Sequence, residues 1–229
     1  MLKKISNIGD CGIVCDFGDE VNKKTNEEVI KLFNFIQDSI KTKKIKGILN
    51  STPSYNKLVV NFDLGEVKSQ EVIDFIKSND YSKIELSENN KLVEIPICYD
   101  EEFALDIKRL EKKTKLSFKE ITKEHLSTEF FVYMIGFIPG HPFMGDLKKK
   151  LHTDRLETPR VKLPKGSIGI VEKFCNLYTF ESPGGWNIIG KTPLNLFDIN
   201  KKDSSLLSPG DTIKFKSITK KDLLSFKNE

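Results

Sequence analysis

The stretch from Gly184 to Pro193, GGWNIIGKTP, has the spacing of a phosphate-binding loop, G-x-x-x-x-G-K-[ST]. In nucleotide hydrolases this loop follows a strand and opens a helix, so that backbone N–H groups and the Lys converge on phosphate. Here the variable positions Trp186 to Ile189 are typical of a strand, and Pro193 biases Thr192 away from helical angles. Because no helix is predicted beyond Lys191, we expect the match to be accidental.

The same letters have a second interpretation. Gly184 and Gly185 predict a tight turn whose backbone amides could bind an anion or a carbonyl oxygen. A hairpin turn that leads into a core Trp186 explains the pattern equally well, and the sequence leaves both interpretations open.

Arginine is rare in this chain. Only Arg109, Arg155 and Arg160 are arginine among 37 basic residues. Because Lys serves elsewhere as the positive charge, a retained Arg indicates a need for the planar, bidentate guanidinium. Three residues are few enough for chance to explain the pattern as well.

The cysteines and histidines show no metal-ligand spacing. Cys11, Cys15, Cys98 and Cys175 form no C-x-x-C pair, and Cys11 and Cys15 lie in an apolar run that favours core packing. We therefore expect free thiols and no metal site in this chain.

Composition limits the class of protein. The 229 residues are 38% hydrophobic with a net charge of +4, which is typical of a globular protein. No basic cluster, apolar signal core or run of about 20 apolar residues is present. Two helical segments within 103–127 resemble a helix-turn-helix, but their turn has no Gly and the second is acidic. We expect a cytoplasmic protein with no nucleic-acid or membrane partner.

The first part of the chain alternates between strand and helix patterns. Thr25 with Glu28 predicts a capping box for the first helix, and Ser69 predicts the cap of the second. The expected order is that of a ferredoxin-like βαββαβ sandwich. Its elements are a strand at 11–17, a helix at 25–42, strands at 44–50 and 57–63, a helix at 69–78 and a strand at 82–87.

The second part is mostly β in character. After a strand at 91–99, the segment 103–127 predicts two helices, the second with a capping box of Ser117 and Glu120. Short apolar runs follow, punctuated by Gly and Pro, with a turn at Pro209-Gly210. They predict a barrel or closed sandwich, with strands at 130–137, 166–172, 177–182, 186–190, 194–199 and 211–218.

Three motifs carry a family resemblance. VYMIGFIPGHPFMGDL (132–147), LETPRVKLPKGSIGIV (156–171) and ESPGGWNIIGKTP (181–193) resemble, in order and spacing, the allophanate hydrolase subunit 1 family. This family is also known as the KipI family or as PxpB, one of the subunits of bacterial 5-oxoprolinase. The N-terminal segments GDCGIVCDFGDEVN and PSYNKLVVNFD fit as well, so the resemblance covers essentially the whole chain.

The resemblance implies an α+β fold with a ferredoxin-like domain at 1–88 and a cyclophilin-like β-barrel domain at 89–229. It implies ATP-dependent cleavage of 5-oxo-L-proline to L-glutamate, an amide hydrolysis. The implied partners are an allophanate hydrolase subunit 2 type (PxpC) subunit and a LamB/YcsF-type (PxpA) subunit. The complex would use ATP, which we do not expect this chain to bind through a phosphate loop. One family branch implies an alternative, inhibition of a sporulation histidine kinase, whereas prolyl isomerisation would rest on fold alone.

Some positions depart from the family pattern. His141 stands where the family usually has Phe, and Asp146 replaces a usual Gly. The segment FCNLYT (174–179) departs from Gln-Thr-Gly-Ile-Tyr-Pro, with Asn176 in place of Gly. The change to Asn176 is mild, because Asn tolerates left-handed backbone angles, whereas the lost Gln-Thr pair puts a substrate contact in doubt or indicates a separate branch.

Opening 5-oxoproline needs cationic and N–H donors for a carboxylate and a developing oxyanion, together with a positioned base. Arg160 suits the carboxylate or a phosphate, and the Gly184 and Gly185 amides suit the oxyanion. His125 or His141 could move a proton near neutral pH, although either could be structural. The expected substrate-binding set is completed by Pro139, Gly140, Ser167 and Ser182. Because these residues do not make a complete active site, the resemblance predicts half of a site shared with a partner.

Overall fold

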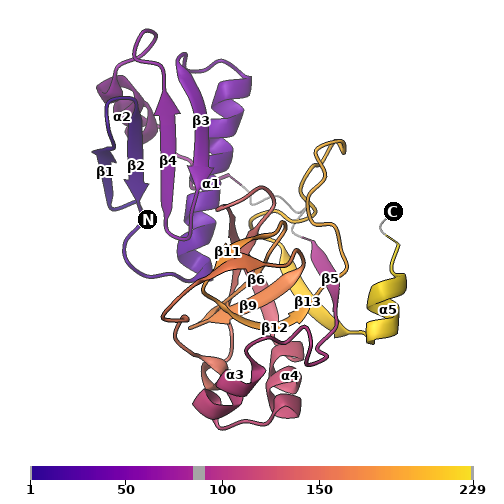
Figure 1. The fold of residues 1–229 in the computed structure, drawn as a ribbon. Coiled ribbons are helices and arrows are strands. Elements are labelled where there is room, and N and C mark those ends of the chain that lie inside the picture. Colours follow the sequence, from indigo (N-terminus) through magenta and orange to yellow (C-terminus); the bar gives the residue numbers. More distant parts are fainter. Residues whose placement is uncertain (1, 85–90, 228–229) are drawn as a thin grey trace. The chain divides into compact units, whose positions relative to one another are not determined.

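The structure is a computed structural model that describes residues 2–84 and 91–227, in two compact units, 1–89 and 90–229 (Figure 1). The boundary expected between residues 88 and 89 lies outside the described residues. Among the described residues, no helix is long and apolar enough to cross a membrane.

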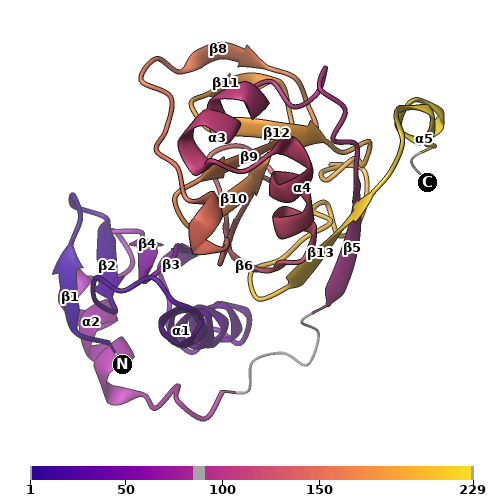
Figure 2. The same cartoon turned by 90° about the horizontal axis from the view of Figure 1, so that it is seen from below.

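The first unit is an antiparallel four-stranded sheet in the order β1-β2-β4-β3, with two helices on one side of it (Figure 2). Apolar side chains of α1 and α2 pack against those of the strands in a shared core. The elements are β1 (Lys4–Asn7), β2 (Gly12–Asp16), α1 (Lys23–Lys41), β3 (Ile48–Pro53), β4 (Lys57–Phe62) and α2 (Ser69–Ser78).

The outer strand of this sheet comes from the N-terminus. β1 forms a hairpin with β2 and occupies the edge beside it, although no strand was expected at Lys4–Asn7. In a βαββαβ sandwich this edge position belongs to the last strand. The strand expected there, at 82–87, lies mostly outside the described residues, and Ser82 and Lys83 form a turn.

Two helix caps differ from the prediction. α1 begins at Lys23, because the Asn22 side chain accepts a hydrogen bond from the Thr25 backbone N–H at 2.8 Å; the expected Thr25 cap is wrong. α2 has the predicted bounds, but Ser69 is its first helical residue instead of its cap. The strand expected at 44–50 begins only at Ile48.

The second unit is built around a seven-stranded sheet in the order β12-β9-β10-β7-β6-β13-β5. A separate ribbon pairs β11 with β8. The strands are β5 (Leu92–Ile97), β6 (Glu129–Ile135), β7 (Pro142–Gly145), β8 (Arg160–Leu163), β9 (Ser167–Val171), β10 (Phe174–Leu177), β11 (Ser182–Gly184), β12 (Asn187–Lys191) and β13 (Thr212–Ser217). The helices are α3 (Ile107–Thr114), α4 (Phe118–Leu126), the 3-10 turn η1 (Lys149–Leu151) and α5 (Lys220–Ser225).

The seven-stranded sheet is strongly curled (Figure 1). Beyond β5, Cys98 forms an antiparallel bridge with Lys191 at the end of β12, with N–O distances of 2.8 and 2.9 Å. The interior is filled by apolar side chains such as Ile97, Ile170 and Ile213, so the curled sheet encloses a packed core. The predicted Ser117–Glu120 capping box of α4 is confirmed.

Two predicted strands of this unit are wrong. Instead of the strand expected at 177–182, β10 ends at Leu177, and the chain then leaves the sheet before β11 begins at Ser182. Residues 194–199 form no strand beyond a bridge from Phe197 to Ser205. Their alternating pattern arises because Leu194 and Leu196 pack onto the core from a loop. The turn at Pro209-Gly210 is confirmed by the hydrogen bond from Asp211 N to Ser208 O.

Candidate active site

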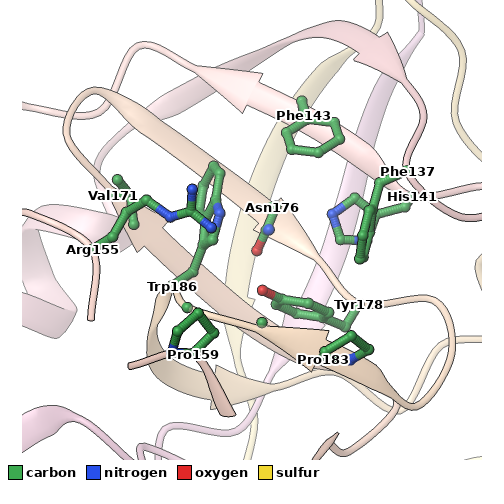
Figure 3. A pocket seen from close by; sticks show the side chains of 12 residues that line it. Phe137, His141, Phe143, Arg155, Pro159, Val171, Asn176, Tyr178, Pro183 and Trp186 are labelled. Carbon is green, nitrogen blue, oxygen red and sulfur yellow. The ribbon is translucent and has the colours of Figure 1, made fainter. Parts of the chain in front are cut away.

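A cavity of about 450 Å³ opens in the second unit, at one face of the curled sheet (Figure 3). This size lies within the range of small-molecule sites, and most of the lining is apolar or aromatic. The lining residues are Phe137, His141, Phe143, Arg155, Pro159, Val171, Asn176, Tyr178, Pro183, Gly184, Gly185 and Trp186.

One wall is formed by the loop between β6 and β7. The Gly136 N–H donates to His141 O at 3.0 Å, and the Thr179 hydroxyl donates to Pro139 O at 2.8 Å. Phe137 has a left-handed φ of 71° and remains 62% exposed. An aromatic residue rarely adopts this conformation, and such strain is concentrated at functional sites. The loop thus presents Phe137 and His141 to the cavity.

His141 is fully buried among aromatic rings. Its ring lies 4.9 Å from Phe143, 5.1 Å from Tyr178 and 5.5 Å from Phe137, measured between centroids. Neither ring nitrogen has a hydrogen-bond partner among the described residues. Burial lowers the pKa of His141 to about 4, so the imidazole is neutral at neutral pH. It therefore offers one N–H donor and one acceptor nitrogen to the cavity.

Asn176 on β10 supplies a second unpartnered polar atom. The residue is buried, and its Oδ1 accepts no hydrogen bond from the described residues. The opposing strand residue is Gly169, at which a Cβ would lie 2.7 Å from Asn176 Oδ1. A larger residue than Gly at position 169 would therefore occupy the space that this amide needs.

Tyr178 lies beside Asn176, and burial raises the pKa of its phenol, an effect that the neighbouring Asn176 side chain partly offsets. The Tyr178 hydroxyl occupies the space that a Cβ on Gly184 would take. The glycine turn thus makes room for the phenol that contacts Asn176.

Arg155 brings a positive charge to the cavity. Its guanidinium lies on the same side as Trp186 in Figure 3, and no carboxylate pairs with it among the described residues. Its backbone is held on two sides: Arg109 donates to Arg155 O at 3.3 Å, and the next residue, Leu156, donates to Gly185 O at 2.8 Å. Such a guanidinium can bind a ligand carboxylate in a bidentate manner.

Arg160, the expected carboxylate-binding residue, has its guanidinium engaged elsewhere. Its backbone lies opposite Gly184 in the β8–β11 ribbon. However, the guanidinium donates to both oxygens of Asp106, at 2.6 and 3.0 Å. Asp106 also accepts from the Ile188 backbone N–H at 2.7 Å. This bidentate ion pair connects β8, β12 and the start of α3, and Arg160 does not line the cavity.

His125, the other expected proton carrier, lies in the core. Its nitrogens lie 2.8 Å from the Tyr99 hydroxyl and 3.5 Å from Cys175 Sγ, and its ring stacks on Phe215. The residue has no exposed surface and does not line the cavity. Burial lowers its pKa to about 3, so it is neutral and surrounded by core side chains.

The remaining expected residues have different environments. Gly184 and Gly185 line the cavity, whereas Pro139 and Gly140 belong to the loop that forms its wall. The Ser167 hydroxyl donates to Pro164 O at 2.7 Å and stays inside the protein. By contrast, the buried Ser182 Oγ has no partner among the described residues.

The segment with the phosphate-loop spacing is not a phosphate loop. Lys191 ends β12, residues 192–196 form no helix, and the Lys191 ammonium group lies over the Phe103 ring. Within residues 2–84 and 91–227, no group of three or more His, Cys, Asp or Glu side chains is arranged to hold a metal ion.

Several lining residues were not predicted to act in the site. Arg155 stood out for the scarcity of arginine and Asn176 as a departure from a family pattern, but neither was assigned a role in the site. Tyr178, Phe137 and Trp186 carried no chemical signal of their own, because aromatic residues at strand spacing are equally typical of a core.

Comparison with known proteins identifies relatives along the whole chain. Residues 3–207 match the family described as "Carboxyltransferase domain, subdomain C and D". The B subunit of the 5-oxoprolinase of Bacillus subtilis (strain 168) is 33% identical over 237 residues, which cover 99% of this chain and 97% of that protein.

Solved structures share the fold. The crystal structure of TTHA0988 superposes with a TM-score of 0.79 at 25% identity. The match covers 90% of this chain and 40% of TTHA0988. The urea carboxylase of Kluyveromyces lactis superposes with a TM-score of 0.76 at 17% identity over 96% of this chain and 22% of that protein. The mixed α/β architecture with a curled, half-barrel sheet is therefore similar to that of urea carboxylase. The match of the family over residues 3–207, together with the full-length relative, establishes that this chain belongs to the family of 5-oxoprolinase B subunits.

Proposed function

We propose that this chain is the B subunit of an ATP-dependent 5-oxoprolinase, which cleaves 5-oxo-L-proline to L-glutamate together with partner subunits. The observation that carries the proposal is the 33% identity along almost the whole length of both this chain and a protein named as the B subunit of a 5-oxoprolinase. The cavity of the second unit is the site that we assign to the substrate.

The chemistry of the cavity supports this assignment. Arg155 would bind the substrate carboxylate, because it is the arginine that lines the cavity without an internal carboxylate partner among the described residues. The flat walls provided by Trp186 and Phe143 suit a small ring. His141, neutral and unpartnered, would donate to or accept from the lactam. Gly184 and Gly185 are retained as candidate donors to the developing oxyanion.

The overall reaction needs more than this cavity provides. The lactam oxygen would take the γ-phosphoryl group of ATP, water would add to the activated carbon as the C–N bond breaks, and a second water would release phosphate. ATP would be used by the complex, with the missing groups supplied by an allophanate hydrolase subunit 2 type subunit and a LamB/YcsF-type subunit. We expect the chain to be inactive without them.

Reconstitution tests this proposal. The chain is co-expressed with the two partner types encoded in the same genome, and glutamate release from 5-oxo-L-proline is measured with and without ATP. We expect glutamate and ADP in equal amounts from the full set of subunits and none when this chain is omitted.

A complex that assembles but releases no more glutamate than the set lacking this chain would contradict the proposal. The kinase-inhibitor alternative gains no support from the Bacillus subtilis relative, which is named as an enzyme subunit, and we do not propose it.

A further inference from the structure

Two buried side chains of the cavity have hydrogen-bonding groups without partners. They are the His141 imidazole, with both nitrogens unpartnered, and Asn176, with its Oδ1 unpartnered, among the described residues. Both residues have at most 1% of their surface exposed. An unsatisfied buried polar group costs about 1–3 kcal/mol, and such groups in a folded protein require an explanation. Both residues line the same cavity, so a ligand bound there would complete these hydrogen bonds.

The two groups are chemically complementary to one amide. Asn176 Oδ1 is an acceptor only and requires an N–H or O–H from the ligand. The neutral imidazole of His141 carries one N–H, which can donate to a carbonyl oxygen. All three residues line the cavity, and in the view of Figure 3 Asn176 lies between Arg155 on one side and His141 on the other.

The position of Asn176 is set by its surroundings. Gly169 and Gly184 leave the space that the Asn176 and Tyr178 side chains fill. His141 is held by the backbone hydrogen bonds of the β6–β7 loop and by the rings of Phe143 and Tyr178. Both polar groups are thus preorganised, which reduces the entropy lost on binding.

We propose that His141 and Asn176 are specificity-determining residues, which bind the C=O and the N–H of a compact amide in a carboxylate-bearing ligand held by Arg155. This inference rests on the proposed function and deepens it, because it assigns recognition of the amide to two named residues.

Three ligands separate the contributions. 5-Oxo-L-proline has the C=O, the N–H and the carboxylate. The lactone analogue, 5-oxotetrahydrofuran-2-carboxylate, lacks the N–H, and cyclopentanecarboxylate lacks both amide groups. Binding is measured by protein-observed NMR titration of the full chain and by calorimetry of the reconstituted complex.

With the unmodified chain, we expect 5-oxo-L-proline to bind at least tenfold more tightly than the lactone. The lactone has no N–H, so Asn176 Oδ1 would stay unpaired when the lactone binds. In Asn176→Ala this preference should fall to about threefold or less. In His141→Phe, which keeps the ring and its packing, both carbonyl ligands should weaken about tenfold while cyclopentanecarboxylate is unaffected.

A stability measurement distinguishes recognition from a structural role. Because the His141 side chain makes no hydrogen bond to the described residues, His141→Phe should leave the melting temperature unchanged or raise it. A residue that holds the fold together would lower it. The control Lys119→Ala, at an exposed helix position, should change neither binding nor stability.

The outcomes separate this inference from the proposed function. If the complex hydrolyses 5-oxo-L-proline and ligand preference is the same in both variants, the inference is overturned and the function stands. If the complex does not hydrolyse it but amide binding depends on His141 and Asn176, the function is overturned and the inference stands. Absence of binding by any of the three ligands, to the chain and to the complex, also overturns the inference.

Discussion

Arg155 and Arg160 lie five residues apart, yet their environments give them different roles. The Arg160 guanidinium is neutralised by Asp106, which is 5% exposed on its side chain, in a bidentate pair. Arg155 has no such partner within the described part of the chain, and it lines the cavity. A guanidinium already bound to a carboxylate inside the protein is not free to bind another from a ligand, so we assign anion recognition to Arg155.

Replacing Arg155 should therefore weaken substrate binding. For Arg155→Ala we expect an increase in KM for 5-oxo-L-proline of about 10- to 100-fold, since a hydrogen bond to a charged group contributes about 1.5–3 kcal/mol. The measurement is the steady-state rate of glutamate release by the reconstituted complex. Lys119→Ala removes a comparable charge from an exposed helix position and should leave KM unchanged. An equal effect of both variants would argue against a specific role.

The two buried histidines predict a loss of stability in mild acid. Burial lowers the pKa of His125 to about 3 and that of His141 to about 4, whereas both should titrate near 6.5 when unfolded. Below pH 6.5 the unfolded chain therefore binds more protons than the folded one. The free energy of unfolding, fully retained above pH 6.5, should fall by about 1.4 kcal/mol per pH unit for each histidine down to about pH 4.

Urea denaturation at pH 7, 6 and 5 checks this expectation. His141→Phe removes one of the two groups, so it should reduce the dependence on pH by about half between pH 6 and pH 5. A variant with the same pH dependence as the unmodified chain would show that the His141 side chain is not held neutral in the fold.

At the scale of secondary-structure elements, Asp106 connects three segments. Asp106 precedes the first residue of α3. Its carboxylate accepts hydrogen bonds from Arg160 on β8 and from the Ile188 N–H on β12, and its backbone N–H donates to Ile188 O. The β8–β11 ribbon, which carries Gly184 to the cavity, is thus tied to the seven-stranded sheet through this carboxylate. Arg160 thus helps to hold the β8–β11 ribbon in place but does not line the cavity.

Arg160→Ala should lower the free energy of unfolding but change the affinity for 5-oxo-L-proline little. It leaves the nearly buried Asp106 carboxylate without its cation, and we expect a loss of about 1–3 kcal/mol in the free energy of unfolding. This range allows for the solvent screening of Arg160, whose side chain is 30% exposed. Urea denaturation gives the loss, and NMR titration should show an affinity for 5-oxo-L-proline within about threefold of the unmodified chain.

Arg160→Lys serves as the matched control, because it keeps the charge but not the two parallel hydrogen bonds. Its stability should lie between those of the unmodified chain and Arg160→Ala. If Arg160→Ala instead abolished ligand binding at full stability, Arg160 would be the anion-binding residue.

At the scale of the whole molecule, the cavity belongs to one unit. Every lining residue lies between Phe137 and Trp186, and the second unit has a hydrophobic core of its own. We propose that residues 89–229 form a separate domain, and that residues 1–88 form another around the core of the four-stranded sheet.

The domain proposal predicts that a fragment of residues 89–229 folds by itself. It should unfold in one cooperative thermal transition, because its core and its sheet are built from its own residues. Its NMR signals at Asn176 and Trp186 should coincide with those of the full chain. A fragment without a cooperative transition would show that the second part requires the first to fold.

Much of the secondary structure followed from local patterns. The bounds of α2, the cap of α4 and the strands β6, β9, β12 and β13 were predicted to within a few residues, because spacing and capping chemistry act over one turn or one strand. The short range of this signal also explains the errors. Asn22 competes locally with Thr25 as a cap, and the loop at 194–199 imitates a strand because it packs on a core formed by distant residues.

The sequence by itself determined that the phosphate-loop spacing is accidental, because Pro193 and the strand pattern at Trp186–Ile189 exclude the required helix. Only the tertiary structure decided which polar residues face the cavity. Arg160 meets a carboxylate 54 positions away, and His125 meets Cys175, 50 positions away. The side-chain partners that neutralise or bury a group come from remote segments, and no local pattern records which segments the folded chain will bring together.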